Sequence, residues 1–196
     1  MKIKLNHYIK KNKLNNMKYK MLLLLVAVLL ISANIELVAQ DDKVAGNLFY
    51  TEFGGPGVLM SANFDSRFLS HTLRGFGFRL GAGFTVKYFE SVTAAGYEEG
   101  LVRTVYTFPA GLNYVFGKPN AASSFEVGAG ISFLSRKTSL FYYGYEKEGN
   151  TIGFLTFMYR VAPVNGGISF RIGFTPIIGT SGDLFPMGAI GFGYAF

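Results

Sequence analysis

The 196-residue sequence contains no cysteine and no tryptophan, and it has only two histidines. Without cysteine there can be no disulfide, no reactive thiolate and no lipid-modified N-terminal cysteine. After residue 41 no run of 18 apolar residues occurs, which excludes a membrane-spanning helix there. Charge is scarce as well: residues 41–196 hold 23 charged side chains in 156 positions, about 15% against about 25% in typical soluble domains.

The motifs of common catalytic sites are also missing. The sequence has no metal-ligand spacing, no phosphate-binding glycine loop and no nucleophile elbow. We therefore expect no enzyme and no cofactor.

The net charge of +7 is concentrated at the N-terminus. Residues 1–40 hold seven lysines and a single acid, Glu36, whereas residues 41–196 hold twelve basic and eleven acidic side chains. The basic balance therefore belongs to the N-terminal segment and does not indicate a nucleic-acid partner.

That N-terminal segment has the pattern of a signal peptide. A lysine-rich front precedes eleven apolar residues at 21–31, inside the range of about 7–15 for a signal peptide and below the roughly 18 needed to span a membrane. We predict a signal peptide over residues 1–40, cleaved before Asp41, with a short lead at 41–46. A translation start at Met17 would explain the long basic front, and an uncleaved anchor is the alternative.

Alternation of period two dominates the rest of the chain and predicts β-strands. The last strand illustrates it, because large side chains (Ile190, Phe192, Tyr194, Phe196) alternate with Gly191, Gly193 and Ala195. Glycine, proline, asparagine or charged clusters separate the alternating segments. We predict eight strands, at 48–54, 58–66, 75–89, 102–116, 124–135, 151–162, 167–178 and 186–196.

Each strand has one apolar face and one face of small or polar residues, which favours a barrel between lipid and a crowded lumen. From Tyr106 to Phe116 is ten residues, about 33 Å of strand or about 23 Å of depth at a tilt of about 45°. The fold class we predict is all-β, an eight-stranded antiparallel up-and-down transmembrane β-barrel over residues 47–196. Pro109 cannot donate a ladder hydrogen bond, so we expect a bulge there. The rival, a soluble barrel of lipocalin type, predicts a charged outer face that this sequence lacks.

Loop lengths agree with that topology. With both termini in the periplasm, we expect the long, charged connections 90–101 and 136–150 outside the cell and the short connections 117–123 and 163–166 in the periplasm. The tight Gly-Gly-Pro-Gly turn at 54–57 and the longer connection 67–74 are exceptions.

Seven charged side chains fall on the predicted inner face. Because unpaired charges in a narrow lumen are costly, we expect these residues to form a network. That network is either a structural plug of salt bridges or the gate of a narrow pore. The residues are Glu52, Asp65, Arg79, Lys87, Glu126, Arg160 and Arg171.

The connection 136–150 carries Tyr142, Tyr143 and Tyr145 together with charges of both signs. Exposed tyrosines make good contact surfaces, so this loop is a candidate site for an extracellular protein or glycan. Alternatively, the tyrosines extend the outer aromatic girdle.

The alternation, the loop asymmetry and the Gly-Tyr-Ala-Phe end together resemble the small eight-stranded outer-membrane barrels of the outer-membrane protein A and porin-like type. The resemblance covers nearly all of residues 47–196. It implies the outer membrane of a Gram-negative bacterium, contact with outer-membrane lipid, and biogenesis through periplasmic chaperones and the barrel-assembly machinery. It also implies that Ile190, Phe192, Tyr194 and Phe196 are the assembly signal. The sequence continues into no periplasmic wall-binding domain after the last strand, which puts a wall-anchoring role in doubt.

Some barrels of this size modify lipid A with a histidine, a serine and an acid. His71 lies beside Ser70, but the predicted topology places both at the periplasmic end, away from the outer leaflet. We therefore expect His71 to be a solvated surface residue. The sequence predicts an envelope barrel with a structural or loop-binding role, or alternatively a narrow channel for small solutes; an outer-leaflet lipid-modifying enzyme is the third hypothesis.

Overall fold

The computed structural model describes residues 44–69, 72–92, 98–138 and 148–196, with backbone alone at 88–92 and 98–101. All of these lie in one compact unit, residues 42–196. The predicted signal peptide, His71, and Tyr142, Tyr143 and Tyr145 lie outside the described residues. Within the described ranges, no helix is long and apolar enough to cross a membrane.

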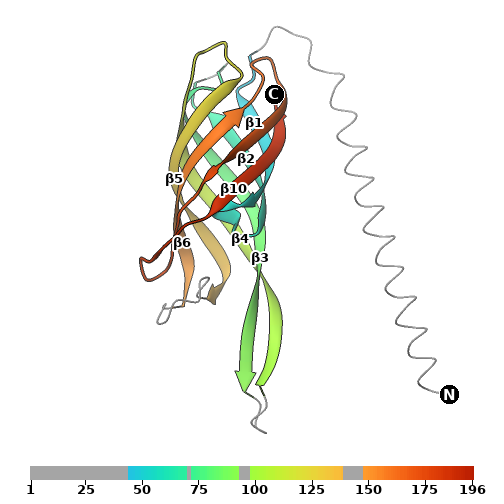
Figure 1. Cartoon of the computed structure of the whole chain (residues 1–196), viewed down its shortest axis with the longest axis vertical. Helices are drawn as coiled ribbons and strands as arrows, with labels where there is room; N and C mark the ends of the chain where they lie inside the picture. The colour runs from blue at the N-terminus through green and yellow to red at the C-terminus, as the bar shows by residue number, and fades with distance from the viewer. Residues whose placement is uncertain (1–43, 70–71, 93–97, 139–147) are drawn as a thin grey trace, which may run out of the picture. The chain divides into compact units, whose positions relative to one another are not determined.

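The described chain is built of strands and one short 3-10 turn, η2 (Gly55–Gly57). Neighbouring strands are antiparallel throughout, and pairing of the last strand, β10, with the first, β1, closes the sheet on itself (Figure 1). The strands are β1 (Asn47–Gly54), β2 (Met60–Arg67), β3 (Gly75–Val92), β4 (Glu98–Phe116), β5 (Ser123–Thr138), β6 (Gly149–Val161), β7 (Gly167–Phe174), β8 (Ile177–Ile178), β9 (Leu184–Phe185) and β10 (Gly188–Ala195).

Two of these strands are continuations of others. β8 pairs with β6 in the register that β7 sets, and β9 pairs with β8 in the register that joins β10 to β7. The breaks contain Pro176 and Pro186, each of which lacks the N–H that a ladder needs. β7 with β8 and β9 with β10 are thus two barrel strands, so the predicted eight-stranded up-and-down barrel is confirmed.

The registers fix the shape of the barrel. A path that starts at Ala195 in β10 and steps between paired residues once around the barrel returns to the barrel strand formed by β9 and β10. It returns at Phe185, ten residues from its starting point. The path runs through Leu48, Asp65, Arg79, Gly111, Gly130, Phe154 and Ile177. Eight strands with this shear, a rise of about 3.3 Å and a spacing of about 4.8 Å give a tilt of about 41° and a radius of about 8 Å.

The two faces of the sheet have opposite chemistry. Large apolar side chains point outward along β4, among them Tyr106, Leu112 and Phe116, each at least half exposed. At the tilt given above, Tyr106 to Phe116 covers about 25 Å along the barrel axis. In β1, Phe49 and Phe53 point outward while Leu48, Tyr50 and Glu52 are buried, so the strand with the least regular sequence alternates like the others.

Pro109 is accommodated without the expected bulge, so that prediction was wrong. The β3–β4 ladder keeps a single register from Gly75 to Val92 and lacks only the pairs opposite Phe108 and Pro109. The β4–β5 ladder is continuous past Pro109, which pairs with Ser132. Because no residue is inserted, the side chains of β4 stay on the same faces before and after the proline. An irregularity does occur in β5, between Phe133 and Thr138.

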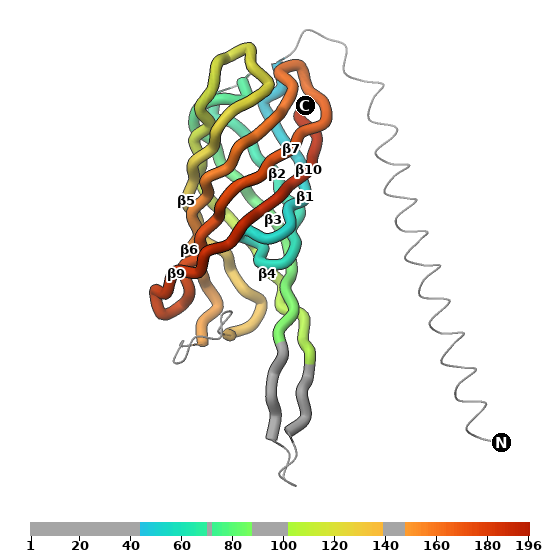
Figure 2. Tube along the Cα trace, in the orientation of Figure 1, coloured from blue at the N-terminus to red at the C-terminus, as the bar shows by residue number. Residues whose placement is uncertain are grey.

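The barrel has two distinct ends. At the terminal end, Ala45 N–H donates to Val164 C=O (2.8 Å), and Gly46 and Asn47 N–H donate to Phe196 C=O (3.2 and 3.0 Å). At the opposite end, here called the hairpin end, β3 and β4 continue beyond the barrel as a two-stranded ribbon (Figure 1), and Figure 2 shows the part of it nearest the barrel. Pairing continues to Val92 and Glu98, so most of the loop predicted at 90–101 is strand.

Candidate functional site

The interior of the barrel holds one continuous chain of ion pairs. Seven charged side chains alternate in sign along it, and none is more than 6% exposed. In order from the hairpin end they are Arg79, Glu52, Arg171, Glu126, Arg160, Asp65 and Arg67. We call this set the ion-pair chain.

The nitrogen–oxygen distances along the ion-pair chain are short enough for direct contact. Arg79 and Arg171 lie 2.7 and 3.2 Å from Glu52. Arg171 and Arg160 lie 3.1 and 2.9 Å from Glu126. Asp65 lies 3.3 Å from Arg160 and 2.5 Å from Arg67. Each acid therefore bridges two arginines.

Six strands contribute to the ion-pair chain, so it ties the barrel wall together across the lumen. Asp65 and Arg67 come from β2, and the other members come singly from β1, β3, β5, β6 and β7. β4 contributes Asn113, whose amide donates to Asp65 Oδ2 (2.5 Å) and whose carbonyl accepts from Arg67 (2.8 Å). Asn63 of β2 likewise accepts from Arg79 (3.3 Å).

The glycines of the inner face make room for these side chains. A Cβ added at Gly191 would lie 2.7 Å from Arg171 Cγ, and one at Gly77 would collide with the Arg67 guanidinium. In a barrel of about 8 Å radius, long arginines fit only where the facing residues are small. The alternation of glycine with aromatic residues therefore has two causes, an apolar exterior and an interior filled by arginine.

Six of the seven predicted inner charges belong to the ion-pair chain, and Lys87 does not. Lys87 is half-buried and lies eight residues beyond Arg79 on β3, about 26 Å along the strand. It pairs in register with Arg103 on the projecting ribbon. Period-two alternation continues past the end of the barrel, so it assigned Lys87 to the inner face although the lumen ends before it.

Arg67 is the member that sequence reasoning missed. The interpretation placed it in the connection 67–74, but β2 includes it and its guanidinium also donates to Gly75 C=O (3.0 Å). The period-two spacing of the strand could have located Arg67, because it lies two residues after Asp65 and therefore on the same face. Tyr50, Asn63 and Asn113 were missed as well, because the predicted network was drawn from charged residues alone.

The ring of Tyr50 contacts two arginines of the ion-pair chain. The Arg171 guanidinium lies 4.3 Å from the ring centroid and that of Arg79 lies 5.6 Å away, both within cation–π range. Arg79 is also 5.7 Å from the Phe154 ring. These contacts offset part of the cost of guanidinium N–H groups, such as those at Arg79 Nη1 and Arg171 Nη1, that have no hydrogen-bond partner among the described residues.

Apolar clusters lie on both sides of the ion-pair chain. At the terminal end Ala45, Leu48, Tyr50, Leu73, Ala162 and Ala195 pack together. At the hairpin end Val105, Leu134, Ile152, Phe154 and Ile177 form a second cluster, against which Val58 packs. The lumen is therefore filled by apolar side chains at each end and by charges between them.

The β1–β2 turn closes the hairpin end further. Sequence reasoning gave this Gly-Gly-Pro-Gly turn as a tight external connection, but Gly55, Pro56 and Gly57 are buried inside the barrel. Ser132 Oγ donates to Pro56 C=O (2.8 Å) and Thr107 Oγ1 to Gly57 C=O (3.2 Å). The turn is buried because the wall at this level presents hydroxyl groups that bind the turn's carbonyls.

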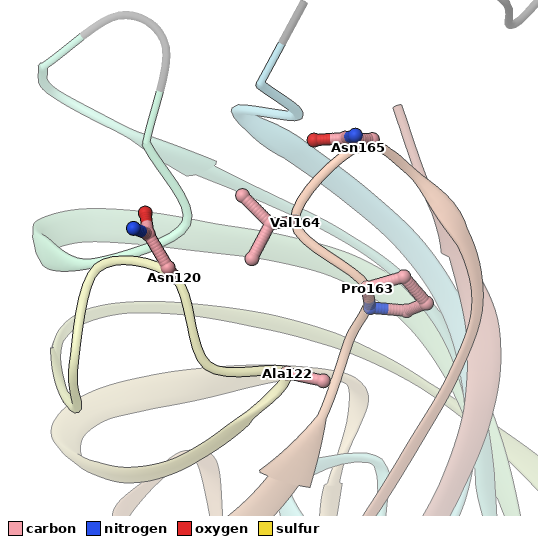
Figure 3. A pocket seen from close by; sticks show the side chains of 5 residues that line it. All are labelled: Asn120, Ala122, Pro163, Val164 and Asn165. Atoms are coloured by element: carbon pink, nitrogen blue, oxygen red, sulfur yellow. The ribbon is translucent and has the colours of Figure 1, made fainter.

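A pocket of about 430 Å³ lies at the terminal end, between the turn that follows β4 and the turn that follows β6 (Figure 3). It is lined by Asn120, Ala122, Pro163, Val164 and Asn165. No lining side chain titrates or acts as a nucleophile, so the pocket offers no catalytic group. Among the described residues, no group of three histidine, aspartate or glutamate side chains is placed to hold a metal ion.

No protein-family model, curated protein or solved structure matches this chain. The closed eight-stranded antiparallel barrel is compatible with a small outer-membrane barrel. The fold is assigned from the pairing of its strands alone.

Proposed function

We propose that this chain is an integral outer-membrane barrel whose lumen is closed by the ion-pair chain and the two apolar clusters, with a structural or surface-binding role. The observation that carries the proposal is that the inner and outer faces of the barrel are inverted relative to those of a soluble protein. Charged residues are buried within, whereas more than twenty large apolar side chains are exposed, many of them around the barrel wall. In water that surface would be unfavourable, and in a bilayer it is the favourable one.

The dimensions support the same conclusion. An apolar band of about 25 Å between Tyr106 and Phe116 matches the height of the band in outer-membrane barrels. Rings cluster at its terminal edge, where Tyr114 lies 4.7 Å from Phe76 and 4.5 Å from Phe116 between centroids. Such aromatic clusters suit the membrane interface, where one side of the ring meets lipid and the other meets water.

The last strand supports a role in assembly. β10 pairs with β1 over seven residues and closes the barrel, while Phe192 and Phe196 remain about half exposed on its outer face. We propose that Ile190, Phe192, Tyr194 and Phe196 are read by periplasmic chaperones and the barrel-assembly machinery before β10 pairs with β1. The connection 136–150 and the ribbon are then the parts left to bind an extracellular protein or glycan.

Spontaneous insertion tests the membrane proposal. Protein unfolded in urea is diluted into lipid vesicles or into buffer, and folding is followed by the shift in gel mobility between unheated and boiled samples. We expect a folded band that floats with the vesicles and aggregation in buffer alone. A folded, monomeric protein in buffer without lipid would contradict the proposal and favour a soluble barrel.

The alternative function is a narrow channel for small solutes. It is favoured by the arrangement of the acids, since each bridges two arginines and could exchange partners without leaving the lumen. Current across a bilayer separates the two functions, because a closed barrel passes none.

A further inference from the structure

We infer that the β1–β2 turn, residues 54–58, is a movable lid that controls access from the hairpin end to the Glu52–Arg79 end of the ion-pair chain. The inference rests on the closed lumen proposed above and adds the part that opens. Water and small polar solutes are what such a lid would admit, since hydroxyl groups line the space that it covers.

The lid lies directly on buried polar groups. A Cβ added at Gly57 would lie 2.5 Å from Ser61 Cβ, and one at Gly55 would lie 3.0 Å from Glu52 Oε2. Gly57 therefore has no room for a side chain, and position 55, where φ is 66°, favours glycine through its backbone conformation. Ser61, Thr107 and Ser132 are all buried beside the lid. If the lid moved outward, the Glu52–Arg79 pair would face the hairpin end of the lumen.

The backbone of the lid is strained. Val58 has φ 70° and ψ −70°, a conformation that is rare for any residue with a side chain and rarer for a β-branched one. Gly54 has φ 73° and ψ −157°, a region that is essentially restricted to glycine. Strain of this kind persists only where surrounding contacts hold it. Release of the lid would relax Val58.

Contacts between the lid and the barrel wall oppose that strain. The lid accepts the side-chain hydrogen bonds from Ser132 and Thr107, and Val58 packs against the apolar cluster. Its backbone hydrogen bonds, from Gly54 N–H to Leu59 C=O (3.0 Å) and from Val58 N–H to Gly55 C=O (2.9 Å), are local to the turn. These local bonds would move with the lid, whereas the two side-chain hydrogen bonds, the packing of Val58 and the pairing of Gly54 with Ala189 in β10 would have to loosen.

A thiol placed beneath the lid would report its opening. The natural chain has no cysteine, so Ser61→Cys gives a single thiol. Folded protein in detergent micelles is treated with a charged methanethiosulfonate reagent, and the labelling rate is followed by mass. Ser124→Cys, a buried position near the terminal end, is the matched control. Micelles make the result independent of whether the barrel belongs in a membrane.

Variants that weaken the contacts between the lid and the barrel wall should raise the labelling rate at position 61 and leave the labelling rate at position 124 unchanged. Ser132→Ala or Thr107→Val each removes one hydrogen bond, for which we expect a three- to tenfold faster rate. Val58→Ala keeps the strain and loses the apolar contact, so it should also label faster. Val58→Gly removes the same contact together with the strain, so it should label about tenfold more slowly than Val58→Ala.

Equal rates at position 61 in all lid variants would overturn the lid and leave a fixed plug, without affecting the closed barrel. Equal acceleration at positions 61 and 124 would also overturn it, because that result indicates loosening of the whole barrel. Should Ser61→Cys fail to fold, amide hydrogen exchange of the unmodified protein replaces it. The amides of 54–59 should then exchange faster than the β1 amides of 48–53, and equal protection would contradict the lid.

Discussion

Replacement of Glu126 by glutamine removes one charge from the middle of the ion-pair chain while keeping the shape of the side chain. Glu126 is fully buried and lies within 3.1 Å of both Arg160 and Arg171. In Glu126→Gln each arginine keeps one acid, since Arg160 still contacts Asp65 and Arg171 still contacts Glu52. We therefore expect the cost of one broken buried pair, about 3–5 kcal/mol, rather than twice that.

A double-mutant cycle with Arg160→Met separates pairing from packing. The seven buried charges sum to +1, Glu126→Gln raises the sum to +2, and the double variant restores +1. The double variant should therefore be less destabilised than the two single costs predict, by at least about 2 kcal/mol. Lys87→Met, which alters a half-buried cation outside the ion-pair chain, is the control and should cost less than about 1 kcal/mol.

The assay is reversible urea unfolding in lipid vesicles. Because the chain has no tryptophan, unfolding is followed by circular dichroism and by the heat-dependent gel shift rather than by tryptophan fluorescence. A double variant whose destabilisation equals the sum of the two single values to within about 0.5 kcal/mol would refute the reasoning, since independent sites show that degree of additivity.

Three further predictions concern the wall, the terminal end and the inner glycines. Leu112→Arg, near the middle of the outer band, should destabilise the barrel in vesicles by about 2–4 kcal/mol, and Phe116→Arg at the band's edge by about 0–1 kcal/mol; equal costs in urea unfolding would contradict the membrane placement. Arg67→Met should cost about 3–5 kcal/mol, because it leaves a buried acid, Asp65, with a weaker partner; a cost below about 1 kcal/mol in the same assay would show that Arg67 is solvated. Gly191→Val should crowd Arg171 and cost about 1–3 kcal/mol, and its effect should shrink when Arg171 is replaced by methionine; an undiminished effect would point to the backbone instead.

Much of the fold could be predicted because an apolar outer surface and a narrow, charged lumen impose opposite requirements on successive residues. The outward Phe192 and the inward Gly191 differ for that reason, and the same rule located six charges of the ion-pair chain. The alternation of inward and outward side chains carries no information, however, on where along a strand the barrel wall ends. It assigned Lys87 to the lumen, although β3 has left the barrel at that level, and strand lengths at 90–101 were underestimated for the same reason.

The other differences arise from contacts between residues distant in the chain. Burial of the β1–β2 turn depends on Ser132 and Thr107, which lie 76 and 50 residues away from the carbonyls they bind. Arg67 joins the lumen because Asp65 and Asn113 accept its hydrogen bonds. Pro109 needs no bulge because the β3–β4 ladder tolerates two missing pairs without changing register. Arg67 alone leaves a periodic trace in the sequence, its spacing of two residues from Asp65, and the other contacts leave none.

Single-channel recording in planar bilayers tests the closed lumen most directly. Folded protein is reconstituted beside the double variant Glu126→Ala, Arg160→Ala, with the gel shift confirming that both are folded. The ion-pair chain and the apolar clusters predict no resolved openings for the unmodified protein, and openings or excess noise for the variant. Discrete openings of the unmodified protein that change on the substitution would contradict the closed lumen and establish the ion pairs as the gate of a channel.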